Sequence, residues 1–321
     1  MVSGTVLLTD YAWPDTALEA GILEGAGLSL VCGPSKALPA NEIARLAARC
    51  RPDAIMTCWA EVSADAIRAC PDLRIVQRMG VGLDNIDVAA AVRQGAVVTN
   101  VPDYCVEEVS DHALGLVLGW ARGIVAFDRE TKRGRWDPTG ASLRRVRDLT
   151  IGIAGFGRIG QRTAVKLAGF DVTLLALDHQ DNLADPTKRV RFVAWPRLLS
   201  DSDAIVIHLP LLPSTAGLFG AAAFAAMRRG ALLVNVARGG LIDNAALLAA
   251  LDSDQLSGAA LDVIDGEPSP PAELLAHPKV IATPHIAFSS FASLLELRRR
   301  SAEEVVRVLQ GEIPRHLCAP R

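Results

Sequence analysis

The sequence has 321 residues, enough for about two domains of ordinary size. Half of the residues are hydrophobic, 21% are charged, and the formal net charge is −3. This composition excludes a disordered chain and a small disulfide-held scaffold, and the near-neutral charge argues against nucleic-acid binding. No apolar run approaches the roughly 18 residues that a membrane span needs. We therefore expect a soluble globular protein that binds neither nucleic acid nor membrane.

The start of the chain carries no recognisable targeting signal. Residues 1–10 form a strand-like run rich in Val and Leu, without the positive region and long apolar stretch of a signal peptide. This predicts a cytoplasmic protein. The six cysteines are scattered without a C-x-x-C pair, which predicts free, mostly buried thiols and no metal site.

Short apolar runs alternate with Ala/Leu-rich helical segments, which is typical of parallel sheets built from βαβ units. In the first third, the expected strands are Val6–Leu8, Leu28–Val31, Ala54–Met56, Arg74–Gln77 and Val97–Thr99, with helices at Asn41–Cys50 and Ser63–Ala69. One long helix is predicted over Val106–Phe127. An exposed connection is predicted from Asp128 to Asp148.

A second strand and helix series follows this connection. Its expected strands are Leu149–Ala154, Val172–Leu177, Ala204–Leu209, Ala231–Val236, Gly258–Leu261 and Val280–Ala282. A charged helix over Ser289–Gln310 ends the series. The fold class is therefore predicted to be α/β, with two parallel-sheet domains.

A glycine-rich turn joins the first strand of this second series to a helical pattern, Gln161–Ala168. It reads G-x-G-x-x-G, with Gly155, Gly157 and Gly160, and Asp178 follows the next strand 18 residues after the last glycine. In such a unit the glycines permit a tight turn and close approach of a pyrophosphate, and the acidic residue binds the adenine ribose. The carboxylate of Asp178 would repel the 2′-phosphate of NADP, so NAD is the predicted cofactor. The positive charges of Lys188 and Arg189, further along the chain, could reduce this preference.

Three later strands each end in a polar group. Arg238 follows Ala231–Val236, Asp262 and Glu267 follow Gly258–Leu261, and His285 follows Val280–Ala282. Together they suit carbonyl reduction, because a histidine can protonate the developing alkoxide. A carboxylate beside the histidine can stabilise its protonated imidazolium form. An arginine can donate two parallel hydrogen bonds to a substrate carboxylate. We predict these roles for His285, Glu267 and Arg238, respectively.

The order of the motifs resembles the D-isomer-specific 2-hydroxyacid dehydrogenases. The motifs are G-x-G-x-x-G, Asp178, H-L-P-L-x-P-x-T, N-x-A-R-G-G, D-V-x-x-x-E-P and T-P-H, and they span nearly the whole chain. The resemblance implies a Rossmann NAD-binding domain, 101–289, inserted into a discontinuous flavodoxin-like substrate domain, 1–100 plus 290–321. Only 36 residues follow His285, which leaves room for one closing helix and not for the regulatory domain of some phosphoglycerate-type relatives.

The resemblance also implies particular residue roles. The catalytic residues would be Arg238, Glu267 and His285. The cofactor would be bound by Gly155, Gly157, Arg158, Ile159, Gly160, Asp178, Leu209, Pro210, Thr215, Val236, Ala237, Asp262 and His285, with Asp262 meeting the nicotinamide carboxamide. The substrate would be bound by Trp59, Arg78, Val81, Gly82, Arg238 and Phe288, and Val106–Phe127 would form much of a homodimer interface.

The sequence leaves the function open between classes. The favoured hypothesis is an NAD-dependent oxidoreductase that interconverts a small 2-keto acid and its D-2-hydroxy acid. The stretch from His285 to Leu294 and the Gly311-Glu-Ile-Pro segment look especially like the C-terminal-binding-protein corepressors. An NAD(H)-sensing, corepressor-like binding protein is therefore one alternative. A phosphite or phosphonate dehydrogenase on the same site is another.

Overall fold

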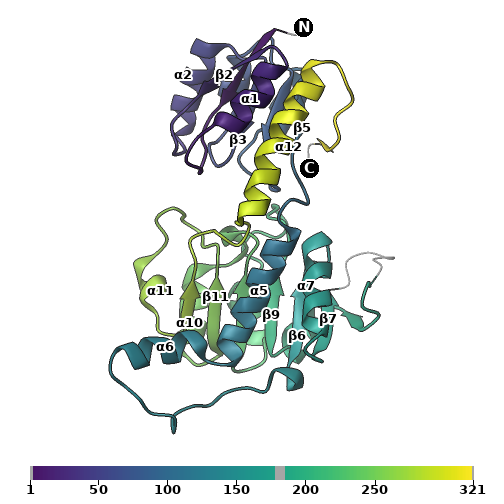
Figure 1. The fold of residues 1–321 in the computed structure, drawn as a ribbon. Helices are drawn as coiled ribbons and strands as arrows, with labels where there is room; N and C mark the ends of the chain where they lie inside the picture. The colour runs from purple at the N-terminus through teal and green to yellow at the C-terminus, as the bar shows by residue number, and fades with distance from the viewer. Residues whose placement is uncertain (1–2, 178–184, 320–321) are drawn as a thin grey trace. The chain divides into compact units, whose positions relative to one another are not determined.

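The computed structural model describes residues 3–177 and 185–319 and divides into two units. Unit 1 consists of Met1–Tyr104 and Ser290–Arg321, and unit 2 of Cys105–Ser289. Each unit is built around its own, mostly parallel sheet (Figure 1). The α/β fold class with two parallel sheets is thereby confirmed.

Among the described residues, unit 1 contains a six-stranded sheet in the order β13-β5-β4-β3-β1-β2. The strands are β1 (Gly4–Leu8), β2 (Leu28–Cys32), β3 (Ala54–Thr57), β4 (Ile75–Arg78), β5 (Val97–Thr99) and β13 (Leu317–Cys318). The first five are parallel, and their order places β1 between β2 and β3, which is the flavodoxin-like arrangement. β13 pairs antiparallel with β5.

The helices of unit 1 complete its core. They are α1 (Ala17–Gly25), α2 (Ala40–Cys50), α3 (Ala64–Arg68), α4 (Val88–Arg93) and α12 (Phe291–Leu309). α12 comes from the end of the chain and packs on α1, β3 and β4. It starts with a capping box between Ser290 and Ser293, and its Arg298 donates two 2.8 Å hydrogen bonds to the buried Glu19 of α1. These contacts tie the last helix to the first residues of the same unit.

The described part of unit 2 contains a seven-stranded sheet in the order β12-β11-β10-β9-β6-β7-β8. The strands are β6 (Thr150–Ala154), β7 (Thr173–Leu177), β8 (Val190–Val193), β9 (Ala204–Ile207), β10 (Ala231–Asn235), β11 (Leu256–Leu261) and β12 (Val280–Ala282). All are parallel, and the order reverses between β6 and β9, as in a Rossmann fold. The edge at the carboxyl ends of these strands is where ligands bind in such sheets.

Helices cover this second sheet on both sides. The helical segments are α5 (Val106–Ala121), α6 (Ile124–Lys132), η1 (Val146–Asp148), α7 (Arg158–Ala168), α8 (Trp195–Asp201), α9 (Ala221–Ala226), η2 (Gly239–Leu241), α10 (Asn244–Asp252) and α11 (Ala272–Ala276). α5 and α7 pack side by side across one face of the sheet (Figure 1). None of the helices in residues 3–177 and 185–319 combines the length and the apolar character needed to cross a membrane.

Some sequence predictions were wrong in detail. The single helix expected over Val106–Phe127 is two helices, because Gly123 adopts a left-handed conformation with φ of 62° between α5 and α6. α6 then extends to Lys132, into the segment predicted as a connection. Strands β8 and β13 were missed, since both are short and β8 has two exposed residues. Three of the cysteines are buried rather than most of them.

Candidate active site

The three polar strand ends meet at one edge of the sheet in unit 2. β10, β11 and β12 are consecutive parallel neighbours, so their carboxyl ends lie together. The segments that follow them carry Arg238, Glu267 and His285 respectively. Residues far apart in the sequence are thereby placed in one neighbourhood by the sheet register alone.

His285 and Glu267 are in direct contact. Nδ1 of His285 lies 2.8 Å from Oε2 of Glu267, and the other carboxylate oxygen accepts the Ile264 N–H at 2.9 Å. Burial raises the pKa of Glu267, but the hydrogen bond and charge of His285, the Ile264 N–H and the charge of Arg238 outweigh it, so its pKa lies below the ordinary range. The carboxylate is therefore ionised and oriented toward the imidazole.

The turn that carries Arg238 is shaped by a buried amide side chain. Asn235 donates from Nδ2 to the Arg238 carbonyl at 2.9 Å and accepts the Ala237 N–H at 3.0 Å. Arg238 also donates from Nη1 to the Ala237 carbonyl. This turn fixes the backbone from which the guanidinium of Arg238 extends. The positive charge of that guanidinium helps to lower the pKa of Glu267. Asn235 is a contributor that the sequence analysis did not assign.

Phe288 lies beside the histidine rather than in the core. Its ring meets His285 edge to face, with centroids 6.1 Å apart. Asp262, by contrast, is almost completely buried. Its two oxygens accept the N–H groups of Ile286 and Ala287 at 2.9 Å each, so the carboxylate is directed at the backbone of the loop that contains His285.

The glycine-rich turn has the space that a dinucleotide needs. Gly155 has φ of 104°, and a Cβ there would lie 2.6 Å from the carbonyl carbon of His208, so only glycine fits. A Cβ on Gly157 would meet no atom within 4 Å, which leaves the backbone open just before α7 begins at Arg158 and Ile159. The first turn of a helix offers free N–H groups to phosphate. The described residues of the turn therefore fit a pyrophosphate.

The other cofactor residues differ in how far the structure describes them. Asp178 lies outside the described residues. Arg189 is engaged with the Ala168 carbonyl at 3.0 Å and with Asp171, which turns it toward the end of α7. Leu209 and Val236 are buried, Pro210 is exposed, and Ala237 is half-buried. Thr215 closes its own loop, with its hydroxyl donating to the Pro210 carbonyl at 2.7 Å.

His208 is unsuited to acid catalysis. Burial lowers its pKa to about 3, and its Nε2 lies 3.0 Å from the hydroxyl of Thr163 on α7. It is a neutral residue that fastens the strand end to the helix.

Unit 1 holds the remaining predicted substrate residues. Arg78 ends β4, and the loop beyond it contains Val81 and Gly82. The carbonyls of this loop are held by Asn100, which bonds the Val81 oxygen at 2.7 Å, and by the Val101 N–H. Within the two described ranges, the amides of Val81 and Gly82 donate no hydrogen bond to the protein. These two amides are therefore available to a ligand.

Trp59 is held by a carboxylate that the sequence analysis missed. The buried Asp10 accepts the N–H groups of Cys58, Trp59 and Ala60 at 3.1, 2.8 and 3.2 Å, and the Thr9 hydroxyl at 2.7 Å. Trp59 itself is 40% exposed. Asp10 lies two residues beyond the end of β1, and an acidic residue just past an apolar strand is the sequence signal that could have identified it.

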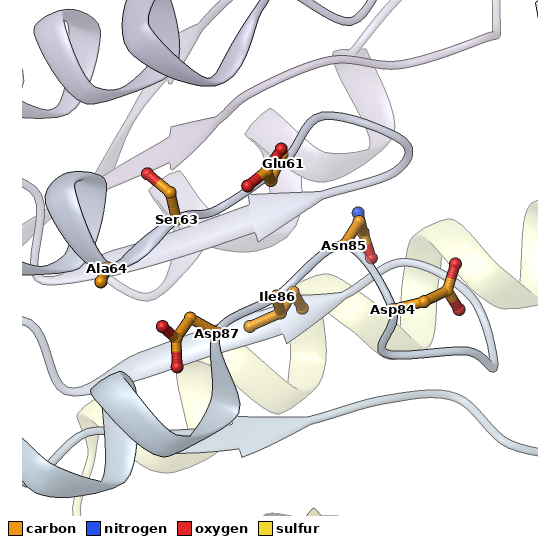
Figure 2. Close-up of a pocket in the computed structure, with 7 residues that line it drawn as sticks. All are labelled: Glu61, Ser63, Ala64, Asp84, Asn85, Ile86 and Asp87. Atoms are coloured by element: carbon orange, nitrogen blue, oxygen red, sulfur yellow. The ribbon is translucent and has the colours of Figure 1, made fainter. Parts of the chain in front are cut away.

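A polar pocket of about 290 Å³ also opens in unit 1 (Figure 2). It is lined by Glu61, Ser63, Ala64, Asp84, Asn85, Ile86 and Asp87. Two of these side chains cap helices: Ser63 accepts the Ala66 N–H and Asp87 the Ala90 N–H. Three acidic side chains in the lining disfavour an anionic ligand, so this pocket is not a candidate site for a carboxylic acid.

Comparisons with known proteins agree with this geometry. Residues 114–287 match the family described as D-isomer specific 2-hydroxyacid dehydrogenase, NAD binding domain. A D-3-phosphoglycerate dehydrogenase of Archaeoglobus fulgidus is 37% identical over 78% of this chain and 48% of its own length. A glyoxylate reductase of Thermofilum pendens is 34% identical over 79% of this chain and 77% of its own. The chain thus spans about half the length of the phosphoglycerate dehydrogenases that it matches.

Solved structures share the fold over nearly the whole chain. A protein of Thermus thermophilus superposes with a TM-score of 0.89 at 29% identity, covering 98% of this chain and all of that one.

Proposed function

The chain belongs to the D-isomer specific 2-hydroxyacid dehydrogenase family, and from this premise we propose that it interconverts a small 2-keto acid and its D-2-hydroxy acid with NAD. The observation that carries the proposal is the contact between His285 and Glu267. This contact supports the proposal because it pairs a histidine with an ionised carboxylate at the strand edge that also carries Arg238 and, beyond β6, the glycine-rich turn.

His285 is the proposed acid in reduction and base in oxidation. Its Nδ1 is engaged by Glu267, and Nε2 has no hydrogen-bond partner in residues 3–177 and 185–319. In reduction, the proton on Nε2 passes to the oxygen of the keto group as that oxygen becomes an alkoxide. The negative charge of Glu267 stabilises the imidazolium before the transfer and fixes the ring plane.

Arg238 and the loop after β4 are the proposed anion-binding groups. The guanidinium of Arg238 offers two parallel N–H donors and a positive charge, which polarise a carbonyl oxygen or pair with a carboxylate. The free amides of Val81 and Gly82 are suited to a carboxylate. Phe288 and Trp59 supply apolar surface for the substrate side chain.

Bound at the glycine-rich turn, NAD would supply or accept the hydride. Gly155 and Gly157 leave room for the pyrophosphate, and the N-terminus of α7 favours its charge. Asp178 is proposed to bind the ribose hydroxyls. The carboxylate of Asp178 would repel a 2′-phosphate, which supports a preference for NAD, and Arg189 is engaged with Asp171 and the Ala168 carbonyl.

A homodimer is part of the proposal. Ile124 at the start of α6 is 59% exposed and Trp136 beyond it is 87% exposed. Ile124 lies within Val106–Phe127, the segment to which the family resemblance gives much of the dimer interface, and Trp136 follows that segment. A second copy of the chain is the proposed partner that covers them.

Turnover of NADH with a panel of keto acids tests the function. Glyoxylate and pyruvate would be offered for reduction, and D-3-phosphoglycerate, D-lactate and L-lactate for oxidation. The expected result is activity with at least one small keto acid and with D- but not L-hydroxy acids, abolished in His285→Ala. Tight NADH binding without turnover of any of these acids would refute the dehydrogenase and favour the cofactor-sensing alternative.

A further inference from the structure

The loop that carries His285 is held by a chain of three side chains, which runs from His112 on α5 through Thr283, just beyond β12, to Asp262, just beyond β11. The Thr283 hydroxyl donates to Oδ1 of Asp262 at 2.6 Å, and Nε2 of His112 lies 3.0 Å from the same hydroxyl oxygen. Because the Thr283 hydrogen points to the carboxylate, the Thr283 oxygen accepts, and Nε2 of His112 must carry the hydrogen that it donates. His112 also lies 3.7 Å from Asp262 Oδ1.

The backbone of this loop needs such a restraint. His285 has φ of 53°, a left-handed conformation that non-glycine residues rarely adopt. Its N–H donates to the Asp262 carbonyl at 2.8 Å, and the next two N–H groups, of Ile286 and Ala287, donate to the Asp262 carboxylate. Asp262 therefore binds three consecutive amides through its backbone and its side chain.

We propose that His112, Thr283 and Asp262 form a clamp that holds the His285 loop in this left-handed conformation, and that His112 and Thr283 are positioning residues for the catalytic histidine. Asp262 is 2% exposed, so its carboxylate oxygens depend on these donors. The Thr283 hydroxyl and the Ile286 N–H both donate to Oδ1 of Asp262, and His112 fixes the direction of that hydroxyl. Loss of the hydroxyl leaves Asp262 underpartnered and releases the loop that keeps Nδ1 of His285 on Glu267.

The clamp itself is independent of the substrate, whereas its catalytic effect rests on the function proposed above. The test therefore has two readouts on the same variants. The first is amide hydrogen exchange of peptides that span residues 283–288, which needs no substrate. The second is kcat for keto-acid reduction, measured beside the Kd for NADH.

Thr283→Val removes the hydroxyl and keeps the shape, and Thr283→Ser keeps the hydroxyl. Thr283→Val is expected to speed exchange of these amides about 10-fold and to lower kcat ~10- to 100-fold through misplacement of His285. The fold-change in kcat should exceed any fold-change in the Kd for NADH. Thr283→Ser should stay close to wild type in both readouts. Thr173→Val, at an exposed strand position of the same unit, is the matched control.

A second pair of variants keeps the proposal falsifiable if Thr283→Val does not fold. His112→Gln retains a donor, and His112→Leu removes it, so only His112→Leu should speed exchange of the loop. Unchanged exchange in folded Thr283→Val or His112→Leu overturns the clamp, as does an equal loss in Thr283→Val and Thr283→Ser. If the wild type reduces no keto acid, the proposed function fails while the exchange rates still decide the clamp.

Discussion

Nδ1 of His285 lies 2.8 Å from Oε2 of Glu267, although the two residues follow different strands of the sheet. The pairing orients the ring and places a negative charge beside it. Its strength depends on whether Glu267 stays ionised, and this dependence gives a prediction in pH.

Glu267→Gln keeps a hydrogen-bonding side chain but removes the charge that stabilises the imidazolium. We expect the activation free energy of reduction to rise by about 2 kcal/mol, which lowers kcat ~30-fold. The pKa of Glu267 lies below its ordinary range, so its carboxylate should keep its charge from neutral pH down to about pH 5 and lose it only as pH falls through the lowered pKa. Acid itself favours the imidazolium, so the wild-type advantage should be largest near neutral pH and should shrink as pH falls. Rate profiles of both proteins between pH 5 and 8, with the exposed Glu273→Gln as control, check this. Equal kcat for the two proteins at neutral pH, or an advantage that grows as pH falls, would contradict it.

Arg238→Lys retains the positive charge and loses the planar fork. Because a lysine cannot present two parallel donors, we expect KM for the keto acid to rise ~10-fold and kcat to fall less than in Arg238→Ala, in which the charge is lost too. Steady-state kinetics at saturating NADH separate these effects. Equal kinetics for Arg238→Lys and the wild type would show that charge alone suffices.

The buried carboxylate of Asp10 should control the Trp59 loop. Asp10→Asn places an amide hydrogen against one of three backbone N–H donors, and we expect a loss of about 1–3 kcal/mol in the free energy of unfolding. It should also change KM selectively among keto acids of different size, and this change should vanish in a Trp59→Ala background. Urea denaturation and kinetics on the double-mutant cycle measure both effects. Additive changes in KM would remove the link between Asp10 and Trp59.

The sequence predicted the fold class because its buried strands are continuous apolar runs, and each of the expected strands overlaps a parallel strand of the structure. The end of α5 could not be predicted, because α5 itself contains glycines. Nothing in the sequence distinguishes them from Gly123, which ends the helix by adopting a left-handed conformation. The edge strands β8 and β13 escaped for a different reason, because neither carries a continuous buried run.

The candidate site shows the same division. Arg238, Glu267 and His285 stand directly beyond strands, where position in the chain already indicates a shared edge. The contacts that hold them are between residues with no such marker: His112 and Thr283 are 171 positions apart, and Asp10 and Trp59 are 49 apart. Only the packing of α5 on the sheet and of β1 beside β3 brings these pairs together.

Cofactor preference should depend on Asp178 and not on Arg189. Asp178→Ala removes the charge that would repel a 2′-phosphate, and we expect the ratio of kcat/KM for NADH over NADPH to fall ~10-fold or more. Arg189→Ala should leave this ratio within about twofold, since Arg189 is engaged with Asp171 and the end of α7. A large loss of NADPH use in Arg189→Ala would instead place that guanidinium at the ribose.

The exposed side chain of Trp136 should be covered in a homodimer. Replacing a buried interface tryptophan typically costs about 2 kcal/mol or more, so Trp136→Ser should weaken dimerisation at least ~30-fold. Phe291→Ser, which removes an 89% exposed aromatic of unit 1, is the matched control and should leave the assembly unchanged. Sedimentation velocity across a concentration series gives the dissociation constants. A wild type that stays monomeric at micromolar concentration, or a dimer indifferent to Trp136→Ser, would show that another surface covers this region or that none does.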